Sequence, residues 1–219
     1  NPHYFINFID FNVIFLLVSM MVIVSITTRS GVFNWIANEL LKFTKGHPIK
    51  ILFALGAFTA VTSAFLDNVT TVILVMPITF AIAKKLDVDP IPYLLTEIFA
   101  SNIGGTATLI GDPPNIIIGS AGGLSFMDFL KELTPVVLVI IVVVLSLLSF
   151  IFRKKLVASE DKMNAIAQID NSHSIVDKNL MIRSTIILAL VIMGFMLHDA
   201  IHIETCVVAM LGASFLLIF

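Results

Sequence analysis

Long apolar runs separated by short polar stretches make up most of this chain. Residues 5–28, 129–152 and 180–198 are each apolar over about the length that an α-helix needs to cross a bilayer, which predicts three transmembrane spans. Residues 29–48 instead mix apolar with charged positions, a pattern typical of an amphipathic helix in the membrane interface. The pattern predicts an all-α polytopic membrane protein.

Composition supports this class. Hydrophobic residues make up 58% of the 219 positions and charged residues 13%, and the mean hydropathy is +1.03. Soluble domains carry about 25% charged residues. The net charge of -2 gives no reason to expect a nucleic-acid partner, and the single Cys206 excludes an intramolecular disulfide within this chain. We expect a multi-pass protein of the cell (plasma or inner) membrane, with the lipid bilayer as a partner.

The first unusual segment covers residues 49–85. Two apolar stretches, 49–66 and 69–83, are separated only by Asp67 and Asn68. At 1.5 Å per residue the second stretch is roughly 22 Å long, shorter than the ~30 Å hydrocarbon core. This favours a re-entrant helical hairpin. Two short full spans with a tight turn are the alternative, and the distribution of basic residues fits both.

The second unusual segment covers residues 91–122 and predicts a broken transmembrane helix. One half-helix covers residues 91–103 and the other 113–122, with a Gly- and Thr-rich connection over 104–112. Gly104 suits the left-handed position after a helix end. Asp112 suits the N-cap of the second half, followed by proline at its first turn. Polar backbone at this depth survives only when it is buried in protein or lines a wet cavity.

The remaining segments complete the predicted organisation. Residues 1–48 form a scaffold span plus the interfacial helix, 153–179 a cytoplasmic loop, and 180–219 a span followed by the beginning of the next. The chain starts without Met and stops within an apolar run, so we expect a fragment of a longer protein.

The two interruptions share a chemistry. Each offers a helix C-terminus and a helix N-terminus near mid-membrane, and such ends attract cations and anions respectively, as in secondary transporters. Neutral oxygens that suit Na⁺ come from Asn68, Thr70, Asn102 and Thr106, and Asp67 can add a charged oxygen. The chain offers no soft ligand cluster for a transition metal.

Two further carboxylates lie in these segments. Glu97 is one turn before Ser101 and can exchange a proton for a cation, or it can form a buried structural hydrogen bond. For Asp112 the alternatives are a plain helix cap and direct ligation of an ion.

These residues carry a family resemblance. The stretch Ser63 to Thr71, with Asp67-Asn68-Val69-Thr70-Thr71 at its end, resembles the first signature of the ion transporter superfamily that includes arsenite permeases. The stretch Ser101 to Asn115 resembles the second signature. The most similar clade includes NhaD-type sodium/proton antiporters and the melanosomal P protein, and citrate and dicarboxylate carriers are more distant. The spacing matches over roughly residues 10–155.

The resemblance implies the N-terminal half of an inverted-repeat carrier, with a scaffold domain and a mobile transport domain. The second half, absent from this chain, would complete the substrate site, and superfamily relatives are often homodimers. By motif matching, the hairpin tip and the broken helix supply the binding residues Asp67, Asn68, Thr70, Thr71, Asn102, Gly104, Gly105, Thr106, Asp112 and Asn115. The tip departs from the Ser-Asn-Thr triplet of the dicarboxylate branch.

We therefore expect a secondary active transporter of a small inorganic ion, working by alternating access and coupled to Na⁺ or H⁺, with no other cofactor. Arsenite or anion efflux and Na⁺/H⁺ antiport are the leading variants. A citrate- or dicarboxylate-type carrier, or an ion channel with the same broken-helix site, is the alternative. An intramembrane enzyme is not expected, because the spans lack a nucleophile–base pair or a metal-binding set.

Overall fold

The computed structural model describes residues 11–167, 174–201 and 203–218, and every regular element within them is a helix. This confirms the predicted all-α class. In chain order the helices are α2 (Phe11–Arg29), α3 (Val32–Phe43), α4 (Pro48–Ser63), α5 (Asn68–Leu86), α6 (Ile91–Gly105), α7 (Pro113–Gly122), α8 (Phe126–Phe152), α9 (Glu160–Ala167), α10 (Lys178–Ile201) and α11 (Thr205–Ile218).

Four helices of the described part are long and apolar enough to cross a membrane: α2, α5, α8 and the Lys178–Leu197 portion of α10. The chain is thus a polytopic membrane protein. The first of the predicted spans is α2, although its predicted residues 5–10 lie outside the described part of the chain. The second predicted span, residues 129–152, corresponds to α8. This helix begins three residues earlier than predicted, because Ser125 and Asp128 form a capping box that starts it at Phe126.

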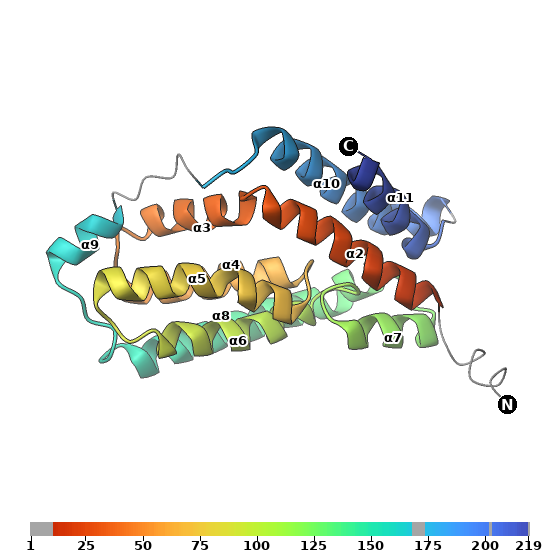
Figure 1. Ribbon diagram of the computed structural model, residues 1–219. Coiled ribbons are helices and arrows are strands. Elements are labelled where there is room, and N and C mark those ends of the chain that lie inside the picture. Colours follow the sequence, from red (N-terminus) through yellow and green to blue (C-terminus); the bar gives the residue numbers. More distant parts are fainter. Residues whose placement is uncertain (1–10, 168–173, 202, 219) are drawn as a thin grey trace, which may run out of the picture.

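The helices pack into two groups, which Figure 1 shows on opposite sides of the molecule. In one group, α2 packs against α10 and α11 around a core that includes Ile23, Val191 and Phe195. In the other, α4, α5, α6 and α8 pack around a core that includes Leu55 and Tyr93. The α6–α7 connection joins the groups, because its Leu109 and Ile110 belong to the core beside α2. The segment α6–α7 therefore contacts both groups.

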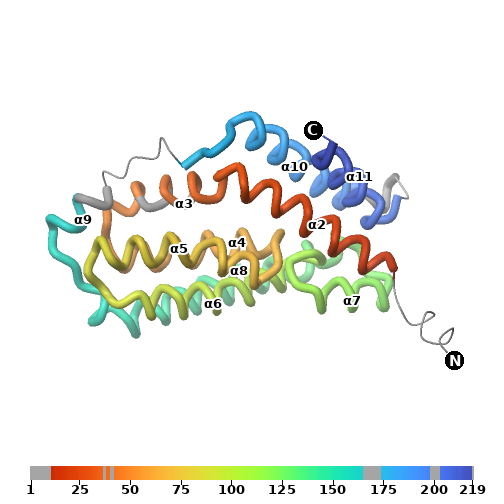
Figure 2. Tube along the Cα trace, viewed as in Figure 1, coloured from red at the N-terminus to blue at the C-terminus, as the bar shows by residue number. Residues whose placement is uncertain are grey.

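The hairpin α4–α5 lies alongside α6, and its turn lies at the level of the α6–α7 connection, as both Figure 1 and Figure 2 show. One premise of the hairpin prediction was wrong, however. α5 has 19 residues rather than the 15 expected, so it is about 28 Å long at 1.5 Å per residue. It is longer because it begins at Asn68 and continues through Lys84 and Lys85 to Leu86, ending where Asp87 adopts a left-handed conformation.

The stretch between α8 and α10 was predicted as a loop, but it contains the eight-residue helix α9. Residues 168–173 of this stretch lie outside the described residues. Lys162 of α9 forms an ion pair with Asp87 at the end of the hairpin, with Nζ and Oδ2 2.7 Å apart. The hydrogen bond and charge of Lys162 lower the pKa of the Asp87 carboxyl below its usual value. This connecting stretch is therefore attached to the hairpin.

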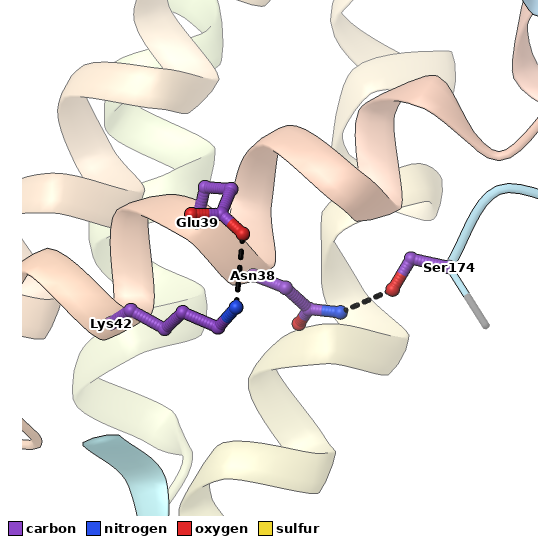
Figure 3. A network of polar contacts seen from close by, with 4 residues as sticks. All are labelled: Asn38, Glu39, Lys42 and Ser174. Carbon is purple, nitrogen blue, oxygen red and sulfur yellow. Dashed lines mark hydrogen bonds and ion pairs between the residues drawn. The ribbon is translucent and has the colours of Figure 1, made fainter. Parts of the chain in front are cut away.

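The predicted helix within residues 29–48 is α3, between α2 and α4. The Asn38 side-chain amide donates to the Ser174 hydroxyl at 2.9 Å, and Lys42 pairs with Glu39 one turn earlier at 3.0 Å (Figure 3). The connection before α10 is thus held to α3 as well as to the hairpin.

Candidate functional site

The hairpin tip is built from the end of α4 and the start of α5. The carboxylate of Asp67 accepts a hydrogen bond from the backbone N–H of Thr70 at 2.9 Å, so Asp67 is the N-cap of α5. Asp67 and Asn68 both have side chains that can cap a helix, and the structure uses Asp67. The negative charge also lies at the positive end of the α5 dipole, a favourable position. Local sequence alone therefore starts α5 and places Asn68 in its first turn.

Gly104 does not adopt the predicted left-handed conformation. It lies inside α6, which continues to Gly105, and the described glycines with positive φ are elsewhere. Its role is to allow close approach. A Cβ atom on Gly104 would lie 2.6 Å from the backbone carbonyl carbon and Cα of Ala60, and closer still to that residue's oxygen. The backbones of α4 and α6 therefore touch here, which brings the hairpin tip next to the end of α6.

Asn68 is the centre of the polar cluster that this contact creates. The Ser63 hydroxyl donates to the Asn68 side-chain oxygen at 2.8 Å. The Asn68 amide nitrogen donates to the Asp112 carboxylate at 3.2 Å and to the Asn102 side-chain oxygen at 3.4 Å. We call Ser63, Asn68, Asn102 and Asp112 the Asn68 cluster. It joins the α4–α5 hairpin to both α6 and α7.

The predicted N-cap position of Asp112 is confirmed, but its side chain does not cap the helix. Asp112 occupies the N-cap position of α7 and its backbone oxygen accepts from Asn115 N–H, but its side chain makes no capping hydrogen bond. The carboxylate is directed to Asn68 instead. A long-range donor on the hairpin thus competes successfully with the local N–H groups.

The connection between α6 and α7 is folded tightly upon itself. The Asn115 amide donates to the backbone oxygens of Gly105, at 3.2 Å, and Thr108, at 2.9 Å. A Cβ on Gly105 would collide with the Asn68 side-chain oxygen, so glycine is required where the connection meets the hairpin. Asn115 and Gly105, both predicted as site residues, therefore shape the backbone around the cluster.

Thr108 is a residue of this site that sequence reasoning did not single out. Its hydroxyl donates to the backbone oxygen of Ala64 in the hairpin turn and accepts from the Gly111 N–H at 3.1 Å. Its burial is not visible from sequence, and its place within the Gly- and Thr-rich motif was the only available signal.

Three predicted threonines lie outside the Asn68 cluster. Thr71 is fully buried, and its hydroxyl has no hydrogen-bond partner among the described residues. Thr106 is exposed and donates to the Ile103 oxygen at 2.7 Å. Thr70 lines a cavity beside α2. Of the four residues predicted to hold Na⁺, the structure thus directly joins Asn68 and Asn102.

Glu97 lies away from the cluster, between α5 and α6. It is fully buried, and one carboxylate oxygen accepts a hydrogen bond from the Thr79 hydroxyl. Its other oxygen has no partner among the described residues. Ser101, on the same face one turn later, donates to the Ile98 oxygen instead. The sequence analysis did not predict that Thr79 contacts Glu97. A signal was present, because Thr71, Val75 and Thr79 recur at intervals of four and form a buried face of α5.

The geometry defines a class of protein. The C-termini of α4 and α6 and the N-termini of α5 and α7 meet around the Asn68 cluster, inside a polytopic helical membrane protein. Side-chain oxygens and helix ends at such a site suit the binding of a small ion. Fold and site together are those of a membrane transport protein.

The chain belongs to the citrate transporter family, whose model matches residues 1–218. It is 44% identical over 210 residues to a 46 kDa membrane protein of Mycobacterium leprae, covering 96% of this chain and 49% of that protein. A Mycobacterium tuberculosis protein named as an uncharacterized transporter is 42% identical over 211 residues, with the same coverage of 96% and 49%. The human P protein is 39% identical over 133 residues, covering 58% of this chain and 16% of its own length.

These matches confirm the predicted superfamily and a transporter rather than an enzyme. The chain spans about half the length of the mycobacterial relatives it matches.

Proposed function

We propose that this chain is the N-terminal half of a secondary active carrier that moves a small inorganic ion, with Na⁺ or H⁺ as the coupling ion. Arsenite or anion efflux and Na⁺/H⁺ antiport are the leading variants. The observation that carries the proposal is the Asn68 cluster, which joins a hairpin tip and a broken helix at their polar interruptions. In this proposal a second, inverted half completes the site and the protein works by alternating access.

The polarity of the Asn68 cluster supports a cation. The amide nitrogen of Asn68, the positive end of a dipole, lies between the Asn102 and Asp112 oxygens. A bound Na⁺ takes that position, with Asn68 turned so that its own oxygen becomes a ligand. This rotation brings the Asn68 NH2 group to Ser63, whose hydroxyl then accepts a hydrogen bond instead of donating one, so ion binding reverses this hydrogen bond at the hairpin tip. Thr70 and Thr106 supply further oxygens once the tip rearranges.

The re-entrant arrangement is part of the same proposal. The length of α5 does not support it, because α5 alone is long enough to cross. Its support is the position of the hairpin turn beside the α6–α7 connection, part-way along the broken helix (Figure 1). If the broken helix crosses the bilayer, the hairpin turns back near mid-depth.

Glu97 is proposed as the group that exchanges a proton for the coupling cation. A carboxyl group that is fully buried with a single hydrogen-bond donor is costly to keep ionised, so it favours the protonated form or a bound cation. Its partner Thr79 comes from the hairpin, so its titration is linked to the packing of α5 against α6.

A second candidate is a carboxylate carrier. The description of the family as citrate transporter favours it. In that case the N-termini of α5 and α7 hold substrate carboxylates through their free N–H groups. The same Asn68 cluster then holds a cation bound together with the substrate.

Flux measurements on the full-length protein in proteoliposomes test the proposal. Arsenite, Na⁺/H⁺ exchange and citrate are assayed separately, each with and without an imposed Na⁺ or pH gradient. We expect flux of one substrate that depends on a gradient. Asn68→Ala and Asp112→Asn abolish it, whereas the matched surface variant Asp161→Asn on α9 leaves it intact. Flux that neither depends on nor generates a gradient refutes the coupled carrier.

Glu97→Gln separates the two roles within the same assay. It keeps the shape of the side chain but cannot exchange a proton, so flux loses its pH dependence. An unchanged pH profile in this variant contradicts the role of Glu97 and leaves the Asn68 cluster to be judged by its own variants.

A further inference from the structure

Two cavities lie along α2, one beside its first turns and the other beside the rest of the helix. The first, about 370 Å³, is lined by Asn12, Val13 and Leu16 of α2 together with the end of α7 and the start of α11. The second, about 340 Å³, is lined by the α2 residues from Leu17 to Arg29 together with the hairpin tip. Between Asn12 and Arg29 the helix rises about 25 Å. The two cavities together thus extend over most of the length of this span.

The α2 residues that line the cavities follow helical periodicity. They are Asn12, Val13, Leu16, Leu17, Met20, Met21, Val24, Ser25, Thr28 and Arg29. Adjacent pairs repeat every four residues, so they form one continuous stripe that winds by about 160° around the helix between Asn12 and Thr28. Polar groups gather at its ends, with Asn12 at the first and Ser25, Thr28 and Arg29 at the last.

The middle of the stripe is closed by four apolar side chains. Leu16 and Leu109 line the first cavity, and Met20 and Ile110 line the second. All four are at most 7% exposed and belong to one packed cluster. An apolar layer of this kind separates two water-accessible spaces, because an ion that enters it loses its hydration without replacement.

The apolar layer is mechanically connected to the Asn68 cluster. Leu109 and Ile110 lie between Thr108, which donates to Ala64 of the hairpin turn, and Gly111, whose N–H donates to Thr108. Asp67 and Thr70 of the tip themselves line the second cavity. The hairpin turn and the side chains that close the stripe are therefore joined through Thr108.

From these observations we infer that the stripe of α2 lines the translocation path, and that Leu109 and Ile110, packed on Leu16 and Met20, form its barrier. The inference rests on the proposed function, because it assigns a route to the carried ion. In this arrangement the two cavities are vestibules that open to opposite sides of the membrane. Glu204 is the charged residue of the first vestibule, and Asp67 and Arg29 are those of the second, among the described residues.

Cysteine accessibility in the full-length protein tests the route without requiring transport. Single cysteines are placed at Ser120 in the first vestibule and Ser25 in the second, with Cys206 and any other native cysteine replaced by serine. A membrane-impermeant methanethiosulfonate reagent is added to one side at a time. We expect Ser120→Cys to react from one side only and Ser25→Cys from the opposite side only. Val139→Cys, on an exposed apolar face of α8, is the matched control and does not react.

Barrier variants provide the second measurement. Leu109→Ala and Ile110→Ala are expected to make proteoliposomes leaky to protons or Na⁺ in the absence of substrate, as read by a trapped pH or Na⁺ dye. Ile141→Ala, which removes a buried side chain between α8 and α4, is expected to stay tight. If the alanine variants do not fold, Leu109→Val and Ile110→Val serve in their place.

The outcomes separate this inference from the proposed function. Reaction of both cysteines from the same side, or of neither in a folded protein, overturns the route even if coupled flux is found. Opposite-sided labelling with a barrier-dependent leak upholds the route even if flux proves uncoupled. If proteoliposomes with the Leu109 and Ile110 variants leak protons or Na⁺ no faster than those with Ile141→Ala, the barrier role of Leu109 and Ile110 is refuted.

Discussion

Replacing Gly104 with alanine tests the contact on which the whole site depends. The added Cβ lies 2.6 Å from two backbone atoms of Ala60, and a backbone cannot rotate away as a side chain can. Overpacking of this kind typically costs about 1–3 kcal/mol, and we take the upper end because backbone must shift. Alanine recovers about 1 kcal/mol of helix propensity relative to glycine. The expected net loss is therefore about 2 kcal/mol.

Thermal unfolding of the purified full-length protein in detergent measures this loss. A destabilisation of 1 kcal/mol shifts the midpoint by about 2–4 °C for chains of 150–250 residues and less for longer ones, so we expect a fall of about 4 °C. Gly122→Ala is the matched control, because its Cβ meets the Leu124 side chain at an ordinary 3.4 Å. That variant is expected to be at least as stable as the native protein.

The functional readout follows from the same geometry. Pushing α6 away from α4 lengthens the bond between Asn68 and Asn102, so Gly104→Ala should also lose transport while Gly122→Ala retains it. A Gly104→Ala protein as stable and as active as the Gly122→Ala protein refutes the close approach, and with it the assembly of the Asn68 cluster by helix contact.

Three other predictions concern single contacts. Thr79→Val removes the one donor to Glu97 found among the described residues and should lower stability by about 1–3 kcal/mol, whereas Thr79→Ser should not, as measured by unfolding of both variants. The pKa of Asp87 is lowered in the folded state, so the stabilisation from its pair with Lys162 is present above the unfolded pKa and is lost as pH falls through the folded pKa. The unfolding midpoint of Asp87→Asn should therefore fall less than that of the native protein as pH is lowered below about 4, and equal slopes argue against the pair. Ser125→Ala removes half of the capping box of α8 and should cost about 0.5–2 kcal/mol, whereas Ser125→Thr should cost less; equal midpoints contradict the cap.

Features that depend on neighbouring residues in the chain could be predicted from the sequence. The apolar runs predict α2, α8 and α10, and Asp67 is an N-cap because its partner Thr70 lies three residues away. The break after α6 was predicted within two residues for the same reason, since Gly and Thr disfavour a continuing helix.

Features that depend on two helices meeting could not be predicted. Gly104 serves the approach of Ala60, and Asp112 is directed to Asn68, 44 residues earlier. Local rules assign both residues to caps, because a cap needs only the adjacent backbone. Here the packing of α4 on α6 brings a donor within reach and local preference is overridden. The same holds for Glu97, whose partner Thr79 comes from another helix.

The sequence separation within the Asn68 cluster has a consequence for biosynthesis. Asn102 and Asp112 follow Asn68 by 34 and 44 residues, so at about 5–20 residues per second the ribosome supplies them roughly 2–9 s after the hairpin tip. Throughout that interval the tip carries a carboxylate and an amide that hydrocarbon cannot satisfy. In the proposed re-entrant arrangement the tip therefore waits in the hydrated channel of the insertion machinery, or at the membrane surface, until α6 and α7 arrive. That arrangement makes final placement of the hairpin a late step of membrane insertion, in which the hairpin enters the bilayer together with α6 and α7.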